Sequence, residues 1–220
     1  MLTQPPEVAM NKLAFSLLAA VASGHAAQAE TQTAVVAGGC FWCVESDFES
    51  VPGVLEVVSG YTGGSLANPS YKQVGGGGTG HREAVEITFD AAMISYGEIL
   101  RLFFRSIDPL DAEGQFCDRG QSYRAAIFVS DPAQQATAAA AKAEAAQALG
   151  RKVVTPILPA TTFWPAEGYH QDYYKGHNIV LTRAGPKQQA NAYQYYRNAC
   201  GRDARVRQVW GDQAVFANQH

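Results

Sequence analysis

The sequence is poor in cysteine, in charge of one sign and in long apolar runs. Four cysteines in 220 residues are too few for a disulfide-built scaffold, although they suffice for redox chemistry or for one or two bridges. The 17 basic residues do not outnumber the 20 acidic residues, which argues against a nucleic-acid-binding surface. No uncharged apolar run reaches the ~20 residues needed to span a membrane. With 47% hydrophobic and 10% aromatic residues, the chain is predicted to be soluble and globular rather than disordered.

The N-terminal segment has the features of a secretory leader. Lys12 precedes an uncharged apolar run over residues 13–22, and Ala27 and Ala29 form a small-x-small cleavage site for signal peptidase. We therefore expect residues 1–29 to be a signal peptide and the mature protein to be exported, to the periplasm. The alternative is an amphipathic helix at the start of the mature protein.

The rest of the chain, residues 30–220, is predicted to form one α+β domain. Apolar residues at helical spacing predict helices over residues 40–48, from Ser95 to about 104, over 132–149 and within 167–177. Alternating or β-branched runs predict strands over residues 33–37, 54–61, 84–89, 123–129 and 153–158. Because strands and helices do not alternate strictly, the pattern favours helices packed on a mixed sheet. After about residue 184 the apolar pattern is weak, and we expect an irregular tail of loop and short helix that wraps the body and carries Cys200.

The most informative stretch is Gly-Gly-Cys-Phe-Trp-Cys at residues 38–43. Cys40 lies at a strand-to-helix junction, where unpaired backbone N–H groups and the helix dipole stabilise a thiolate. Cys43, three residues further on, can close a disulfide with Cys40. The motif thus indicates redox or nucleophilic chemistry. The alternatives are a structural bridge and half of a zinc site, but Cys117, Cys200 and the histidines provide no second ligand pair with zinc spacing.

A glycine run at residues 75–80, Gly-Gly-Gly-Gly-Thr-Gly, resembles a dinucleotide-binding loop only in composition. Such a loop opens a helix, whereas a strand pattern follows here, and no Gly-Lys-Ser or Gly-Lys-Thr follows to make a phosphate loop. The run is better interpreted as a flexible turn that brings His81 and Glu83 toward another part of the fold. Considered singly, Glu83, Asp118 and His170 are more often structural than catalytic.

Five short blocks follow one another between residues 33 and about 180. They are Gly-Cys-Phe-Trp at 39–42, Gly-Tyr-Thr-Gly-Gly at 60–64, Gly-His-Arg-Glu-Ala-Val at 80–85, Asp-Arg-Gly-Gln-Ser-Tyr-Arg at 118–124 and Ala-Glu-Gly-Tyr-His-Gln at 166–171. In content and order the blocks resemble the peptide methionine sulfoxide reductase A family. The resemblance implies a single-domain two-layer α/β sandwich with a mixed sheet and a ferredoxin-like core.

The resemblance also implies roles for individual residues. Cys40 would attack the sulfur of methionine sulfoxide as the nucleophile. A sulfoxide oxygen leaves poorly unless it is protonated, and Glu83 matches the family's acid. Tyr61 and Tyr123 match the tyrosines that hydrogen-bond this oxygen. Asp118 matches an aspartate that supports the site through hydrogen bonds or water.

Further roles concern the substrate pocket and the fate of the oxidised cysteine. By resemblance, Phe41 and Trp42 would cradle the S-methyl group. The sulfenic acid formed on the nucleophile would condense with a second thiol. Many relatives have glycine in place of Cys43 and resolve with cysteines of the C-terminal tail. We favour Cys200 over Cys43 for this step and expect Cys117 to be an ordinary packed thiol.

The implied enzyme is a peptide-methionine (S)-S-oxide reductase that repairs oxidised methionines in proteins, with free methionine sulfoxide left open as a substrate. It would use no metal or other cofactor, and a thioredoxin-like protein would supply the electrons. With the export signal, its substrates would be proteins outside the cytoplasm, and we expect a monomer without a nucleic-acid partner. Two other interpretations stay open. They are a thioredoxin-like disulfide oxidoreductase, indifferent to Glu83→Gln, and a secreted domain held by two bridges, which reduction would unfold.

Overall fold

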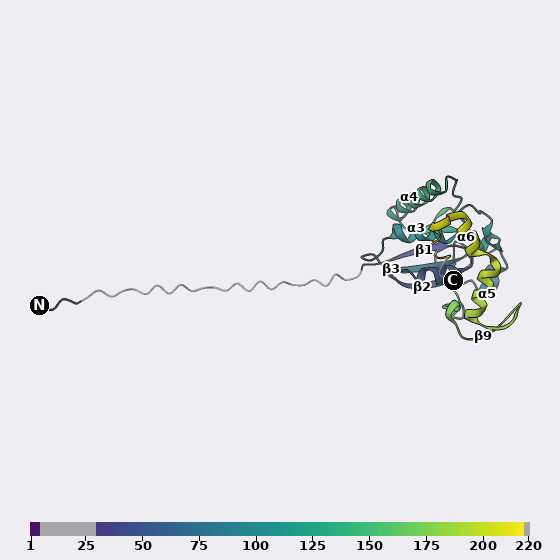
Figure 1. The fold of residues 1–220 in the computed structure, drawn as a ribbon, viewed down its shortest axis with the longest axis horizontal. Helices are drawn as coiled ribbons and strands as arrows, with labels where there is room; N and C mark the ends of the chain where they lie inside the picture. The colour runs from purple at the N-terminus through teal and green to yellow at the C-terminus, as the bar shows by residue number, and fades with distance from the viewer. Residues whose placement is uncertain (5–29, 218–220) are drawn as a thin grey trace.

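The computed structural model describes residues 1–4 and 30–217, and Figure 1 shows how their elements are arranged. The predicted signal peptide, residues 1–29, therefore lies outside the described residues from residue 5 onward. The α-helices are α1 (Phe41–Glu49), α2 (Tyr71–Gly75), α3 (Tyr96–Ser106), α4 (Pro132–Leu149), α5 (Gln189–Cys200) and α6 (Arg202–Trp210). The longer strands are β1 (Thr31–Ala37), β2 (Val54–Thr62), β3 (Arg82–Asp90), β6 (Ala126–Val129), β9 (Ile179–Thr182) and β10 (Gly185–Gln188). Within the part of the chain that is described, no helix is apolar and long enough to cross a membrane.

Six strands form one mixed sheet in the order β7-β6-β1-β3-β2-β8, where β7 is Ile157–Pro159 and β8 is Trp164–Pro165. Neighbouring strands are antiparallel except β6 and β7, which are parallel. Two separate ribbons, β9–β10 and β4 (Gly114–Gln115) with β5 (Asp118–Arg119), complete the strands. The mixed sheet with packed helices confirms the predicted α+β class.

The helices cover one face of the sheet, as the alternation of side chains along β3 shows. Val85, Ile87 and Phe89 belong to the main apolar core, together with residues of α1, α3, α4 and α6. Ala84 faces the other way and packs in a small cluster with Phe128 and Phe163. Since successive residues of a strand point to opposite faces, the body consists of a sheet layer and a helix layer. Figure 1 shows α3 and α4 lying along the same side of the strands.

Local capping signals place two of these helices where the sequence predicts them. The Ser95 hydroxyl accepts the N–H of Glu98 at 3.2 Å, and the Glu98 carboxylate accepts the N–H of Ser95 at 2.9 Å, a reciprocal capping box that begins α3. The Asp131 carboxylate caps α4 ahead of Pro132, and Gly150 ends the helix with φ +59°. A proline at the first turn and a left-handed glycine after the last are the preferred ends of a helix.

Three predicted elements are shorter than expected. Tyr123 lies in a 3-10 turn, η1 (Gln121–Tyr123), and its N–H donates to the carbonyl of Gly120, so that β6 begins only at Ala126. The strand predicted over residues 153–158 covers only Ile157–Pro159, because the N–H of Val154 donates to a loop carbonyl. The helix predicted within residues 167–177 is the single 3-10 turn η2 (Tyr173–Lys175).

The C-terminal tail is more regular than the predicted loop and short helix, since the chain beyond residue 178 forms the β9–β10 hairpin followed by the two helices α5 and α6. These helices dock through buried charges as well as apolar side chains. Arg197 of α5 and Arg202 of α6 lie 2.9 and 3.6 Å from the carboxylate of Asp47 on α1. Arg202 also donates to the carbonyl oxygens of Gly38 and Ser106. An apolar pattern cannot reveal helices that are anchored in this way.

Candidate active site

A cavity of about 620 Å³ opens between the start of α1, the β4–β5 ribbon and helix α5. All four cysteines of the chain lie in its wall: Cys40, Cys43, Cys117 and Cys200. Five further residues predicted from the sequence also line it: Phe41, Trp42, Glu83, Asp118 and Tyr123. The fold thus brings together residues that are up to 160 positions apart in the sequence, and of the predicted site residues only Tyr61 is absent from this wall.

Cys40 lies at the N-terminal end of α1, as predicted. The residue before it, Gly39, has φ +82°, and a Cβ atom there would lie 2.6 Å from the Cβ of Gln115. Glycine is therefore needed for the tight turn from β1 into α1. The N–H of Cys43 donates to the carbonyl of Cys40 at 3.1 Å, which places the two thiols about one helical turn apart.

Glu83 is a buried carboxyl on β3 whose surroundings favour its protonated form. Its Oε2 accepts the backbone N–H of Phe41 at 3.1 Å, which ties it to the residue next to Cys40. Burial raises the pKa of Glu83 to about 8, and the nearby carboxylate of Asp118 contributes in the same direction. A carboxyl that keeps its proton at neutral pH can act as a general acid.

The two thiols at the start of α1 have opposite electrostatic surroundings. A hydrogen bond with Cys43, burial, and the carboxyl groups of Glu83 and Asp118 raise the pKa of Cys40. The same hydrogen bond, together with the guanidinium groups of Arg202 and Arg197, lowers the pKa of Cys43 to about 7. These surroundings favour the protonated form of Cys40 and ease the ionisation of Cys43. From the sequence, a thiolate stabilised by the helix start is expected at Cys40, whereas these contacts favour the thiol form.

Tyr71 lies in the cavity wall with Tyr123, whereas the predicted Tyr61 does not. Tyr61 is fully buried, its hydroxyl donates to Glu167 at 2.9 Å, and it does not line the cavity. Tyr71, the first residue of α2, does line it and shares a hydrogen bond with Tyr123. The site therefore holds Tyr71 and Tyr123 near Glu83, and sequence reasoning missed Tyr71.

A detectable signal precedes Tyr71. Ser70 and Gln73 form a capping box, and a Ser-x-x-Gln spacing is a sequence signature of a helix start. The N–H of Tyr71 donates to Glu167 at 3.0 Å, so the same carboxylate holds both Tyr61 and Tyr71. Tyr61 is thus a support of the wall behind Tyr71.

Phe41 and Trp42 form an aromatic wall, as predicted for a methyl pocket. Trp42 stacks on Tyr173 with ring centroids 3.7 Å apart, a contact that the sequence does not indicate. His170 is buried behind them, 5.0 Å from Phe41 and 5.5 Å from Trp42 between ring centroids. Burial lowers the pKa of His170 to about 4, so it is neutral and serves as packing.

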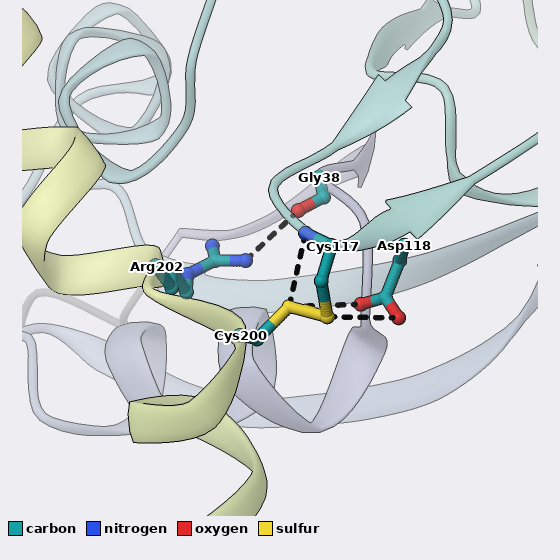
Figure 2. Close-up of a disulfide and its surroundings, with 5 residues drawn as sticks. All are labelled: Gly38, Cys117, Asp118, Cys200 and Arg202. Carbon is teal, nitrogen blue, oxygen red and sulfur yellow. Dashed lines mark hydrogen bonds between the residues drawn. A yellow bond between two sulfur atoms is a disulfide. The ribbon is translucent and has the colours of Figure 1, made fainter.

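Cys117 and Cys200 form a disulfide at the edge of the cavity, so the expectation that Cys117 is an ordinary packed thiol is wrong. Figure 2 shows the bond between the β4–β5 ribbon and the end of α5. The two carboxylate oxygens of Asp118 lie 3.7 and 3.9 Å from the two sulfurs. Cys40 and Cys43 are both free thiols. The cavity therefore contains one oxidised and one reduced cysteine pair.

Among the described residues, two groups could offer three metal ligands each: Cys117, Asp118 and Cys200, and Glu45, Glu49 and Asp172. The sulfurs of the first group are joined to each other. In the second group, Glu45 accepts hydrogen bonds from Ser59 and from the backbone of Asp172. Neither group presents an open set of ligands.

The family model described as peptide methionine sulfoxide reductase matches residues 32–213. This match covers most of the chain and includes every residue of the cavity. The chain belongs to the peptide methionine sulfoxide reductase family. The resemblance drawn from the five blocks is thereby confirmed.

Related proteins agree with this assignment. The reductase is 50% identical over 199 residues to the peptide methionine sulfoxide reductase MsrA 2 of Caulobacter vibrioides, covering 90% of this chain and 94% of that protein. It is 49% identical over 192 residues to MsrA 2 of Rhizobium meliloti, covering 87% and 90%. Among solved structures, it resembles reduced Mxr1 of Saccharomyces cerevisiae, with TM-score 0.63 and 30% identity over 66% of this chain and 84% of that one. Methionine sulfoxide reductase A of Corynebacterium diphtheriae gives TM-score 0.60 and 27% identity over 74% and 85%.

The reductase is therefore an enzyme, as predicted, with the fold of this family. Neither a thioredoxin-like oxidoreductase nor a domain held by two bridges accounts for the family match. The free thiols of Cys40 and Cys43 also contradict a scaffold in which all four cysteines are bridged.

Proposed function

We propose that this reductase converts methionine-S-sulfoxide in proteins to methionine, with Cys40 as the nucleophile. The observation that carries the proposal is the cavity that joins this thiol to the buried, protonated carboxyl of Glu83. Cys40 attacks the sulfoxide sulfur, and the oxygen passes to the cysteine. The products are methionine and a sulfenic acid on Cys40, so the substrate sulfur is reduced and the cysteine sulfur is oxidised. The preference for the S epimer rests on the family relationship.

Glu83 supplies the proton that the sulfoxide oxygen needs in order to leave its sulfur, and the proton that the Cys40 thiol releases returns to Glu83. The hydroxyls of Tyr71 and Tyr123 line the same cavity, and burial raises the pKa of both, so both remain hydrogen-bond donors. Donors fixed where negative charge develops stabilise a transition state without reorganisation. Asp118 supports Glu83 electrostatically, since its charge helps to keep the acid protonated.

The aromatic wall of Phe41, Trp42 and Tyr173 provides an apolar surface for the S-methyl group of the substrate. The stacked rings of Trp42 and Tyr173 restrict the width of this surface. A methyl group binds such a wall in preference to water, since burial of each carbon contributes about 0.8 kcal/mol of favourable transfer free energy.

Cys43 is the better placed thiol for the resolving step, which reverses the preference for Cys200 drawn from the sequence. Its sulfur shares a hydrogen bond with Cys40, and its lowered pKa increases the fraction of thiolate, which is the form that attacks a sulfenic acid. Condensation of the sulfenic acid with the Cys43 thiol gives a disulfide and releases one water. Cys200 is bonded to Cys117 instead.

The Cys117–Cys200 pair then acts as a second dithiol. When reduced, it exchanges with the Cys40–Cys43 disulfide, so that the inner pair regains two thiols and the outer pair becomes the disulfide. A thioredoxin-like protein reduces the outer pair, and the exposure of Cys117 supports access by a protein donor. No prosthetic group is needed for these steps.

The N-terminal segment is the basis for proposing that the enzyme acts in the periplasm. Lys12, the apolar run over residues 13–22 and the site at Ala27 and Ala29 support export to the periplasm. Substrates would be oxidised proteins outside the cytoplasm, and the enzyme would act as a monomer. Mass spectrometry of the mature protein from fractionated cells tests this part. A cytosolic protein that retains residues 1–29 contradicts it.

The reaction is tested with a racemic methionine-sulfoxide peptide, dithiothreitol as reductant, and separation of the two epimers. Wild-type protein should consume only the S epimer, and Cys40→Ser should consume neither. If folded, reduced wild-type protein consumes neither epimer, the proposal is wrong. Disulfide exchange by the Cys40 and Cys43 thiols would then be the activity to test.

A further inference from the structure

The β9–β10 hairpin carries apolar side chains on its outer face. Ile179 is 68% exposed and Leu181 is 83% exposed, and Leu181 pairs across the hairpin with Pro186. Because side chains alternate along a strand, these three residues share one face, which we call the hairpin face. Figure 1 shows β9 projecting from the body beside α5.

The opposite side of the hairpin is already covered. Thr182 is buried, and Val180 packs against the cluster that includes Ala192 and Tyr193 of α5. The hairpin is therefore fixed by its inner side, and the exposure of Ile179 and Leu181 is not a consequence of a loose segment. Adjacent exposed apolar side chains on a fixed element are typical of interaction surfaces.

The hairpin face is continuous with the catalytic cavity. Leu181 and Arg183 line the same cavity as Cys40, and so does Tyr196 of α5, which is 36% exposed. A methionine sulfoxide whose sulfur reaches Cys40 enters through this mouth. The rest of its polypeptide chain must then lie against the rim of the cavity, where Leu181 leads directly to Ile179.

We propose that the hairpin face binds apolar residues that flank the oxidised methionine in an extended, unfolded segment of the substrate protein. The proposal rests on the proposed function and adds the class of polypeptide that the site selects. Side chains two apart in an extended segment lie on one side, about 7 Å apart, which matches the spacing of Ile179 and Leu181 along β9. Methionines that are normally buried have apolar neighbours, and unfolding exposes both together.

The test compares Ile179→Asn with wild type, using dithiothreitol so that no protein donor is present. Three substrates are used, namely N-acetyl-methionine-S-sulfoxide, a blocked pentapeptide with leucine and valine around methionine-S-sulfoxide, and the same peptide with serine and glycine there. Ile179 is exposed and does not line the cavity, so the variant should fold normally. The KM for the apolar peptide should rise about tenfold, with kcat and the KM values of the other two substrates unchanged.

The matched control is Leu55→Asn, at a leucine of β2 that is 57% exposed and does not line the cavity. It should leave all three KM values unchanged. An equal rise for all three substrates, or no rise for the apolar peptide, overturns the proposal. Two further measurements can also overturn it. One is an assay with a thioredoxin-type donor in place of dithiothreitol, where a change confined to the KM for that donor would make the face a donor site. The other is size-exclusion chromatography, where a wild-type dimer that Ile179→Asn dissociates would make the face a dimer contact. Failure of wild type on every sulfoxide would instead overturn the proposed function itself.

Discussion

Glu83→Gln should inactivate the enzyme and stabilise its fold at the same time. The amide keeps an oxygen that can accept the Phe41 N–H, which the Glu83 carboxylate accepts at 3.1 Å. It cannot donate an acidic proton to the sulfoxide oxygen, and loss of a general acid costs about 10²- to 10⁴-fold in rate. It also has no charge to be buried when the pH rises.

The size of the stabilisation follows from the pKa of Glu83, which burial raises from 4.5 to about 8. Below pH 4.5 both the folded and the unfolded protein carry the proton, and the contribution of the protonated carboxyl to stability is complete. As the pH rises toward 8, the unfolded chain releases the proton while the folded protein retains it, so this contribution is lost. At pH 7 the solution is roughly 2.5 pH units above the pKa of the unfolded carboxyl, so the stability lost is about 3 kcal/mol at 1.36 kcal/mol per unit.

Urea unfolding between pH 4.5 and 8.5 measures this difference. The unfolding free energy of Glu83→Gln should exceed that of wild type by an amount that grows with pH and levels off above pH 8. Glu56→Gln, at an exposed glutamate of β2, serves as control and should gain no comparable stability as the pH rises. Single-turnover reduction by wild type should decline above about pH 8, because the acid is active only while protonated. Parallel stability curves for wild type and Glu83→Gln would refute the argument that this carboxyl holds its proton.

The remaining predictions concern the tyrosines and the outer thiols. Tyr71→Phe should lower kcat/KM about tenfold through loss of one hydrogen bond to the substrate. Tyr61→Phe should leave kcat/KM unchanged and cost about 1 kcal/mol of stability in urea unfolding. Equal effects of the two variants on kcat/KM would contradict the assignment of Tyr71, rather than Tyr61, to the site. Cys43→Ser should release one methionine per enzyme and then accumulate a sulfenic acid that a dimedone label detects by mass. Cys117→Ala should also release one methionine per enzyme, but its turnover with a thioredoxin-type donor should fall at least tenfold. Normal donor-driven turnover in Cys117→Ala would exclude the outer pair from the electron path.

Elements with local signals could be predicted from the sequence, and elements held by distant charges could not. The α4 helix begins and ends where Asp131, Pro132 and Gly150 predict, since caps act within a few residues. The sequence indicates only one short helix in the C-terminal tail, where the structure has α5 and α6, because two of the side chains that anchor them, Arg197 and Arg202, are charged and reach their partners only in the folded chain. Hydrophobic periodicity does not report such contacts.

The site shows the same division. Cys40, Glu83, Asp118 and Tyr123 lie in recognisable blocks, and the fold places all four in one cavity. Tyr71 lies outside the blocks, and only its capping box indicated a helix start at that point. The Cys117–Cys200 bond links residues 83 positions apart, and four cysteines allow three pairings that sequence alone cannot separate.

The hydrogen bond between Cys40 and Cys43 contributes most to the difference between their pKa values, and buried charges, those of the C-terminal helices among them, add to it. The carboxyl groups of Glu83 and Asp118 act on Cys40, while Arg197 and Arg202 act on Cys43. Burying two guanidinium groups is costly unless each is paired, and Asp47 pairs with both.

Arg202 also holds the turn before the nucleophile, because it donates to the carbonyl of Gly38 from 164 positions away. Figure 2 shows this arginine beside the Cys117–Cys200 bond. The same short segment therefore supplies Cys200, positions the turn that presents Cys40 and lowers the pKa of Cys43. The negative groups near Cys40 and the positive groups near Cys43 thus come from different parts of the fold, Glu83 and Asp118 from β3 and β5, and Arg197 and Arg202 from α5 and α6.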